Sequence, residues 1–519
     1  MASSRAIKKP KRDTQLTNYQ PMPERAPSIE REERPTVARV LAMIGLFFSV
    51  LGTLAMFAPM WQRSAAISPG MGFFFATIGA ALILYHTFVE RDSQFRRLYG
   101  FLGLALVIGG VALRLMAFRT GYMSWFLFYG LPALLVGLIV MLAVIRNETE
   151  MQFRNLLVNC AGGVGALMIA FAGIMGMRDP NFLPGEGVML LILGLIYVSV
   201  YIGQQEAGSE RAFQAALGLG AIGVLGFAAG LIRSLLPDSN FLVPDGLILM
   251  GMSITYIAVA LGICSDLPVI LLARRDLAAY FYSPIAYLVF VGMTCVGGIM
   301  FAFFVNNIMG DGPRGGGILE PIVAEYIFSI YPVIVQMFIV PVLTMRLLSE
   351  EKRTGTLEVL MTAPVNEISV VVGKFLACWI FYMLTWLPWW LFLVALRYVG
   401  HEEFDYRPVL SFTAALAVIS AGLLSMGLFF SSMTSNQIIA AVLTFVGMMM
   451  HLAFFFLSFQ PAIREGTALQ EILRFVNFFE LWQSSLGGTL APRFLMFHLS
   501  VAIFFLFATV KMLESRKWK

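Results

Sequence analysis

Histidines and nucleophile motifs are the residues of this 519-residue chain that could bind a metal or carry out nucleophilic catalysis. The sequence contains neither an H-E-x-x-H metal motif nor a G-x-S-x-G nucleophile motif. Its four histidines, His86, His401, His451 and His498, are far apart, and the last two lie in apolar runs, where a buried hydrogen-bonding role is more common than metal ligation. We therefore expect no catalytic residue, no metal site and no cofactor.

Nucleotide hydrolysis and proton coupling also lack their usual residues. A phosphate-binding loop of the form G-x-x-x-x-G-K-[ST] is absent, because Ile368 stands where the first glycine belongs and Phe375 follows Gly373 and Lys374. No Asp or Glu lies near the middle of an apolar run, which argues against a proton-coupled carrier. An acidic stretch at 401–405 could hold a cation, although a solvated loop is the simpler interpretation.

The composition is that of a membrane protein. Hydrophobic residues make up 59% of the chain, charged residues make up 13%, and the mean hydropathy is +0.80. Soluble domains carry roughly a quarter charged residues, so a soluble globular enzyme is excluded. The net charge of +5 comes mostly from the two ends of the chain, which is too little and too terminal for nucleic-acid binding. The lipid bilayer is the predicted partner of most of this surface.

About fourteen apolar runs have the roughly 20 residues that a helix needs to cross a bilayer. They begin near residues 37, 71, 99, 123, 155, 187, 212, 247, 286, 325, 368, 410, 437 and 494. Loop residues such as Arg96, Arg146, Arg274 and Arg346 fall on the side of the basic N-terminal tail. Positively charged loops stay inside the cell, and an even number of spans places both termini on one side, so both are predicted to be cytoplasmic.

The chain divides into three predicted regions. Residues 1–36 are polar and rich in proline and form a disordered cytoplasmic tail, 37–264 form an eight-helix membrane domain, and 265–519 form a six-helix membrane domain. The fold class is therefore all-α.

Glycines spaced seven apart indicate that the eight-helix domain is built from four repeated hairpins. The pairs recur at intervals of about 58 residues, one hairpin per period. They are Gly72 and Gly79, Gly130 and Gly137, Gly187 and Gly194, and Gly246 with Ser253. Small residues on one helix face favour close packing of neighbouring helices, although a substrate path lined by the repeats is an alternative. Arg114 and Arg233 lie near the outer ends of their runs, so we expect both to extend to the lipid headgroups.

The segment from Met345 to Pro364 is the most informative connection between two runs. Charged residues come first, a glycine that should break the helix follows, and a short amphipathic turn ends at proline. A short helix of this kind lying at the membrane surface is what a soluble motor could push against. Spacing alone does not exclude an ordinary amphipathic connector.

Three places in the second half resemble ABC-2 type transporter permeases, in particular the gliding-motility type. The run R-L-L-S-E-E-K-R-T-G-T-L-E-V-L-M-T-A-P-V, with V-G-K-F after it, is similar to the first cytoplasmic loop of that family. The stretch at 273–287 resembles its amphipathic helix and first span, and F-F-E at 478–480, the last span and L-E-S-R-K-W at 513–518 resemble its closing pattern. The resemblance covers about residues 265–519.

This resemblance implies a six-span permease half in a bacterial inner (plasma) membrane. Such proteins pair with a second permease half, the same or different, and are powered by a separate cytoplasmic ABC ATPase that receives the loop helix. Leu357, Leu360 and Met361 would be its apolar contacts, and Glu350, Glu351 and Arg353 its polar ones. The full ATPase-coupling loop comprises Glu350, Glu351, Arg353, Gly355, Thr356, Leu357, Glu358, Leu360, Met361, Thr362 and Pro364. A hairpin of short helices before the last span is also implied, where Leu469, Ile472, Leu473 and Val476 recur at helical spacing.

The sequence thus predicts the membrane subunit of an ABC-2 type exporter. A rival from another class is a non-transporting membrane scaffold that anchors an envelope or gliding-type machine. An integral membrane enzyme is a weaker alternative, because the acid, base and metal groups are missing. The chain itself is predicted not to be an enzyme.

Overall fold

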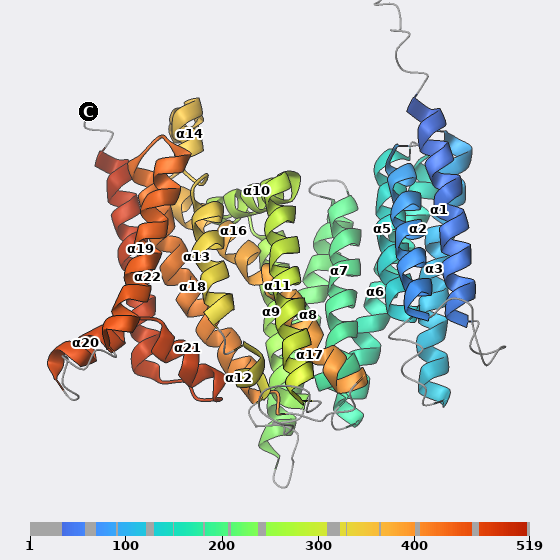
Figure 1. Ribbon diagram of the computed structural model, residues 1–519. Helices are drawn as coiled ribbons and strands as arrows, with labels where there is room; N and C mark the ends of the chain where they lie inside the picture. Colours follow the sequence, from blue (N-terminus) through green and yellow to red (C-terminus); the bar gives the residue numbers. More distant parts are fainter. Residues whose placement is uncertain are drawn as a thin grey trace, which may run out of the picture. The chain divides into compact units, whose positions relative to one another are not determined.

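A computed structural model describes most of the chain. The described residues are 34–57, 69–89, 92–120, 129–148, 150–179, 182–205, 209–236, 245–308, 322–327, 330–362, 365–399, 405–458 and 467–515. All regular structure in these ranges is helical, as Figure 1 shows. Most of the predicted tail at 1–36 and most of the acidic stretch at 401–405 fall outside them.

Helices in the first half follow the predicted apolar runs. They are α1 Arg34–Phe57, α2 Pro69–Val89, α3 Ser93–Thr120, α5 Leu131–Asn147, α6 Met151–Arg178, the π-helical turn η4 Leu183–Gly187, α7 Val188–Gln204, α8 Glu210–Leu235 and α9 Leu247–Cys264.

Helices in the second half include several short ones. They are α10 Pro268–Tyr282, α11 Pro284–Ile308, α12 Ile322–Ile327, α13 Ile330–Thr344, α14 Ser349–Thr354, α15 Thr356–Thr362, α16 Glu367–Thr385, α17 Leu387–Val399, α18 Arg407–Met433, α19 Gln437–Ser458, α20 Ala468–Val476, α21 Phe479–Leu486 and α22 Pro492–Glu514.

Length and apolar composition confirm an all-α membrane protein. In the part of the chain that the structure describes, ten helices are long and apolar enough to cross a membrane. Four shorter apolar helices occupy other predicted positions: Arg39–Gly52, Ile78–Thr87, Leu131–Arg146 and Val188–Gln204. The count of fourteen spans and the cytoplasmic location of the termini stay predictions.

The chain forms two compact units. The first comprises Met1–Val111 and Leu131–Arg154, and the second comprises Ala112–Gly130 and Asn155–Lys519. The break falls inside the predicted repeat region, so the second unit contains α6 to α9 together with the whole second half of the chain. The predicted boundary between residues 264 and 265 stays a prediction.

In all four hairpins, one glycine or serine of the predicted pairs lies where two backbones meet. A Cβ added to Gly45 would lie 3.0 Å from the carbonyl oxygen of Gly79, and one added to Gly103 would lie 3.1 Å from that of Gly137. Gly165 approaches Gly194 at 2.9 Å in the same way, and Gly223 approaches Ser253 at 2.8 Å. These contacts leave no room for a side chain, which supports packing as the reason for the repeat.

Two first members of the predicted pairs, Gly187 and Gly246, lie at helix starts, whereas Gly72 is at a close contact, 2.6 Å from a Cβ added to Gly52. Gly187 ends η4 and caps the start of α7, and Gly246 caps the start of α9. A Cβ at Gly187 would meet Leu183 at 2.7 Å and Phe182 at 3.0 Å, both in the turn just before it. The prediction that Gly187 separates neighbouring helices is therefore wrong, because its close contacts are local.

Arg114 also departs from the sequence-based expectation. Its side chain is only 6% exposed and forms an ion pair with Glu186. The guanidinium carbon lies 5.1 Å from the ring centre of Phe171 and 5.9 Å from that of Phe182. The prediction that Arg114 extends to the headgroups is wrong, because a carboxylate and two aromatic faces satisfy its charge inside the unit.

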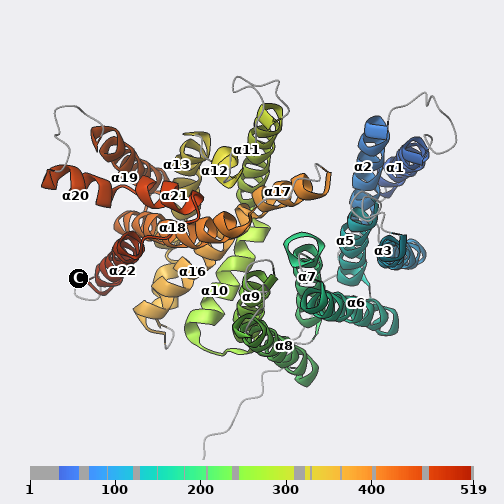
Figure 2. The same cartoon turned by 90° about the horizontal axis from the view of Figure 1, so that it is seen from below.

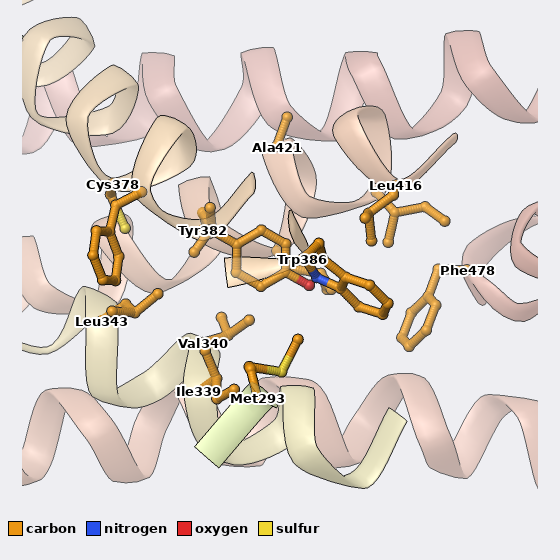
Figure 3. Close-up of a cluster of buried hydrophobic side chains, with 14 of the residues drawn as sticks. Met293, Ile339, Val340, Leu343, Cys378, Tyr382, Trp386, Leu416, Ala421 and Phe478 are labelled. Atoms are coloured by element: carbon orange, nitrogen blue, oxygen red, sulfur yellow. The ribbon is translucent and has the colours of Figure 1, made fainter. Parts of the chain in front are cut away.

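Helix α18 is the central helix of the second half. Figure 2 shows α16, α19, α21 and α22 around it, and α13 packs on it as well. The core between these helices is large and aromatic, and Figure 3 shows Tyr382 and Trp386 within it, near Val340 and Met293. Large buried rings give the bundle a single packed core that can support a site at one end.

The predicted run at 368–396 divides into two helices. Helix α16 ends at Thr385, and α17 begins at Leu387, one residue before Pro388. Pro388 has no backbone N–H to bond the carbonyl of Leu384, and a proline is tolerated in the first turn of a helix, which accounts for the break before α17. At the opposite end of α16, Figure 1 shows α10 lying across the ends of the spans, with α14 and the last turn of α22 at that same end of the bundle.

Candidate functional site

The loop that the sequence singled out, from Met345 to Pro364, contains two short helices with a bend between them. Gly355 ends α14 in the left-handed conformation, with a φ of 73°, and α15 starts at the next residue. Side chains other than glycine rarely adopt this conformation, so the glycine places the bend. The predicted helix break at this position is confirmed.

Hydrogen bonds from α18 hold the start of α14. The hydroxyl oxygen of Ser431 accepts the backbone N–H of Leu348 at 3.2 Å and that of Ser349 at 3.1 Å. The same hydroxyl donates to the carbonyl of Met345 at 3.2 Å. Leu348 and Ser349 are buried, so one serine satisfies two N–H groups that the start of α14 leaves without helical partners. The loop is thus fixed to the central helix.

A buried lysine joins three helices at this end of the bundle. Lys374, near the start of α16, is 4% exposed. Its Nζ atom lies 2.6 Å from Oε1 of Glu351 on α14 and 3.1 Å from Oδ2 of Asp276 on α10. Arg275 adds a bond of 2.8 Å to the second oxygen of Asp276 and lies 3.9 Å from Glu351. We call Lys374, Asp276, Glu351 and Arg275 the lysine cluster.

Charge balance makes the lysine cluster possible. Two cations face two carboxylates, and a lysine removed from water is tolerable only when such partners are present. Removing one charged side chain would leave another buried charge without a partner. With all four present, the ion pairs hold the side chains in one arrangement. The geometry therefore ties the positions of α10, α14 and α16 to one another.

Gly373 allows the lysine cluster to form. A Cβ at this residue would lie 2.9 Å from Cβ of Leu272 and 3.0 Å from the carbonyl oxygen of Val269, both on α10. Only a residue without a side chain lets α16 approach α10 this closely, which brings Lys374 within reach of Asp276. The V-G-K-F stretch is thus explained by helix packing.

A second set of contacts joins α10 to α13. The guanidinium of Arg346 donates to Glu350 at 2.9 Å and to the hydroxyl of Ser283 at 3.2 Å. Tyr280 donates to the carbonyl of Leu343 at 3.0 Å and stacks on Phe381 with ring centres 4.9 Å apart. Burial raises the pKa of Tyr280 well above its ordinary value, so it stays a neutral donor.

These two sets of contacts border a cavity of about 230 Å³. Asp276, Tyr280, Arg346, Glu350 and Lys374 are among its lining residues. Each of these side chains already has a protein partner, so the arrangement suits a mechanical joint more than an acid–base centre.

A comparison with known protein families gives a match that includes the loop and α16. Residues 320–482 match the family model for ABC-2 family transporter proteins. This segment is therefore similar to ABC-2 family transporter proteins. The predicted resemblance is confirmed over these residues, and the apolar helices make the chain a multi-pass membrane protein. No curated protein and no solved structure matched the chain.

The lysine cluster lies across the border of the ABC-2 match. Lys374 and Glu351 fall inside residues 320–482, whereas α10 with Arg275 and Asp276 precedes them. The last span, α22, follows the match. Helices on both sides of the match pack on helices within it, because α10 packs on α16 and α22 packs on α18.

Several predicted coupling residues face water. Arg353, Gly355, Thr356 and Glu358 are exposed on α14, α15 and the bend between them. Leu360 is half-buried. Met361 and Thr362 belong to α15, but their side chains and Pro364 lie outside the described residues.

Three predicted coupling residues are instead engaged within the domain. Leu357 is 4% exposed and packs into the aromatic core, so it offers little surface to an ATPase here, and its predicted contact stays a prediction. Glu351 is bound to Lys374, and Glu350 is bound to Arg346. A partner would reach these residues only through the exposed residues beside them.

Sequence reasoning missed Lys374 and Asp276 as members of the site. In the sequence, Lys374 was considered only as part of a stretch that does not match the phosphate-binding loop. A signal was present, because a lysine just inside an apolar run is costly unless a carboxylate reaches it. The identity of that carboxylate was beyond sequence patterns, since Asp276 is 98 positions away.

Proposed function

We propose that this chain is the membrane-spanning permease subunit of an ABC-2 type exporter that couples to a separate cytoplasmic ABC ATPase. The observation that carries the proposal is the lysine cluster, which joins the loop helix to two membrane-domain helices within an ABC-2 domain. The sequence has no phosphate-binding loop, so ATP hydrolysis would belong to the partner chain.

The contacts support a route for force from the loop into the membrane. An ATPase would bind the exposed face formed by Arg353, Thr356 and Glu358. Displacement of α14 would act on Glu351, and because Glu351 and Asp276 share Lys374, it would move α16 and α10 together. Ser431 would carry the same displacement to α18.

The proposal includes a membrane location for the chain and a second permease half as its partner. The chain would lie in the bacterial inner membrane with α14 and both termini in the cytoplasm, as the Lys and Arg distribution predicts. A second permease half, identical or different, would complete the transporter, as the family resemblance implies. Oligomers of membrane subunits commonly close by two-fold symmetry, which suits a pair of ATPase subunits.

The test is ATP hydrolysis by the complex purified from its native membranes and reconstituted in vesicles. Glu358→Arg and Arg353→Glu reverse charges on the exposed face and should weaken ATPase binding, with loss of permease-dependent hydrolysis. Glu210→Arg, at the exposed start of α8, is the matched control and should behave like the parent. Thermal unfolding of all variants should be unchanged within about 0.5 kcal/mol, because the residues are exposed.

A membrane scaffold that only anchors a machine predicts another result. In that case an ATPase either fails to co-purify or hydrolyses ATP at the same rate with and without this subunit. Either result would contradict the exporter proposal.

A further inference from the structure

A groove runs along the outside of the bundle between α19 and α22. Its volume is about 590 Å³, and its floor is α18, which contributes Met426 and Phe430. Both wall helices pack on α18, and Figure 2 shows α19 and α22 on different sides of it. The groove is therefore bounded by three helices that are each long and apolar enough to cross a membrane.

The groove has the length and the lining of a hydrocarbon slot. Its wall on α19 extends from Leu443 to Phe454, a rise of about 16 Å along a helix. One leaflet of the hydrocarbon core is about 15 Å thick, which is half of the full core. Gly447 keeps the slot open to its floor, because a Cβ there would lie 2.9 Å from the thioether of Met426.

Polar groups gather at one end of this slot. His451 and Ser500 are among the lining residues. Nδ1 of His451 lies 3.2 Å from the carbonyl oxygen of Val476, the last residue of α20. Elsewhere the lining is formed by aliphatic, aromatic and methionine side chains. The slot thus has an apolar body and one polar end, close to α20.

A cation stands just beyond the polar end. Arg493 is exposed at the start of α22, with its guanidinium carbon 5.6 Å from the ring centre of Phe475 and 4.8 Å from that of Phe494. Phe475 also contacts Phe497, which lines the slot. Arg493 and Phe497 are four residues apart on one helix and share a face. No carboxylate in the described part of the chain pairs with Arg493.

We propose that this groove binds one acyl chain of an anionic phospholipid whose phosphate is held by Arg493. The apolar lining excludes water, the length matches one leaflet, and the fixed guanidinium lies at the end where a headgroup would be. The occupant is a lipid of the leaflet on the side of α20. This inference is independent of the ATPase proposal, because no residue is shared with the coupling loop.

Photolabelling of the full chain in lipid vesicles tests the proposal. The vesicles would contain phosphatidylcholine and a small share of phosphatidylglycerol with a diazirine on one acyl chain. Labelled peptides should be concentrated on the groove residues of α19 and α22, several-fold above the exposed face of α11 around Leu288 and Val291. Equal labelling of both faces would mean annular lipid only and would overturn the proposal.

Variants separate the chain site from the headgroup site. Gly447→Leu should fill the groove and reduce its labelling several-fold. Gly292→Leu on α11 has no neighbouring atoms within 4 Å of its Cβ and should leave that labelling unchanged. Arg493→Gln is exposed and keeps the fold, so it tests the proposal even if Gly447→Leu does not assemble.

With Arg493→Gln, the groove should lose its preference for the phosphatidylglycerol probe over a phosphatidylcholine probe of the same chain length. An unchanged preference would overturn the role of Arg493. Cross-links between groove residues of two copies of the chain, in place of lipid adducts, would overturn the lipid assignment in favour of an interface.

Discussion

The repeated hairpins and the core of the ABC-2 domain pack their helices with side chains of very different size. Hairpins bring backbones together at glycines, as between Gly165 and Gly194, whereas the ABC-2 domain fills its core with large rings such as Trp386 and Trp482. The ABC-2 domain also contains a buried, salt-bridged lysine at one end. Glycine contacts hold the two helices of one hairpin together, whereas Lys374 connects three helices that are far apart in the sequence.

The largest effect is expected from removing the shared charge. Lys374→Met would leave the carboxylates of Asp276 and Glu351 without their buried partner, at a cost of about 2–4 kcal/mol. Thermal unfolding in detergent would measure it. Lys374→Arg keeps the charge and should lose far less, and if Lys374→Met unfolds with the parent, the lysine cluster is not what joins these helices.

A large effect is also expected from the core side of the loop. Leu357→Ala should cost about 2–4 kcal/mol, because it opens a cavity next to the aromatic core. Its exposed neighbour Thr356→Ala should change the free energy of unfolding by less than about 0.5 kcal/mol. Equal, small effects in both variants would mean that Leu357 does not pack inside the ABC-2 domain.

In the hairpins, the expected effect is that of overpacking. A leucine at Gly194 has no room beside Gly165 and Ile169, so Gly194→Leu should cost about 1–3 kcal/mol. Gly251→Leu is a control in α9, where no atom lies within 4 Å of an added Cβ, and it should be neutral or stabilising. A parent-like melting temperature for Gly194→Leu would remove the physical basis of the repeat.

The smallest effects should be the same in both regions. Ser209 caps α8 by accepting the N–H of Ala212 at 3.3 Å, and Thr467 caps α20 by accepting that of Gln470 at 3.4 Å. Replacing either with alanine should cost about 1 kcal/mol, because capping is local and independent of the core. Ser209→Asn should restore the loss. Clearly unequal costs would show that the two regions differ in more than packing and charge.

Local features of this fold could be predicted from the sequence. Gly355 broke the loop helix as expected, since a left-handed bend is a property of one residue. The glycines of the repeat predicted close helix packing, although Gly187 proved to pack against its own preceding turn. Periodicity and length were sufficient for the helices, because these depend on neighbours along the chain.

Long-range partners were beyond the sequence. Arg114 looked like an interfacial residue until Glu186, Phe171 and Phe182 were found around it. Leu357 looked like a surface anchor on a short amphipathic turn, but the core of the ABC-2 domain covers it. In both residues, burial is decided by which helices meet, and a single sequence without its fold does not contain that information.

Coupling through the lysine cluster is the central claim, and ATP hydrolysis by the reconstituted complex tests it most directly. Rates for the parent, Lys374→Arg and Lys374→Met would be compared at equal amounts of folded complex with the ATPase still bound. We predict that permease-dependent hydrolysis persists with arginine and is lost with methionine. Full permease-dependent hydrolysis with Lys374→Met would contradict the claim.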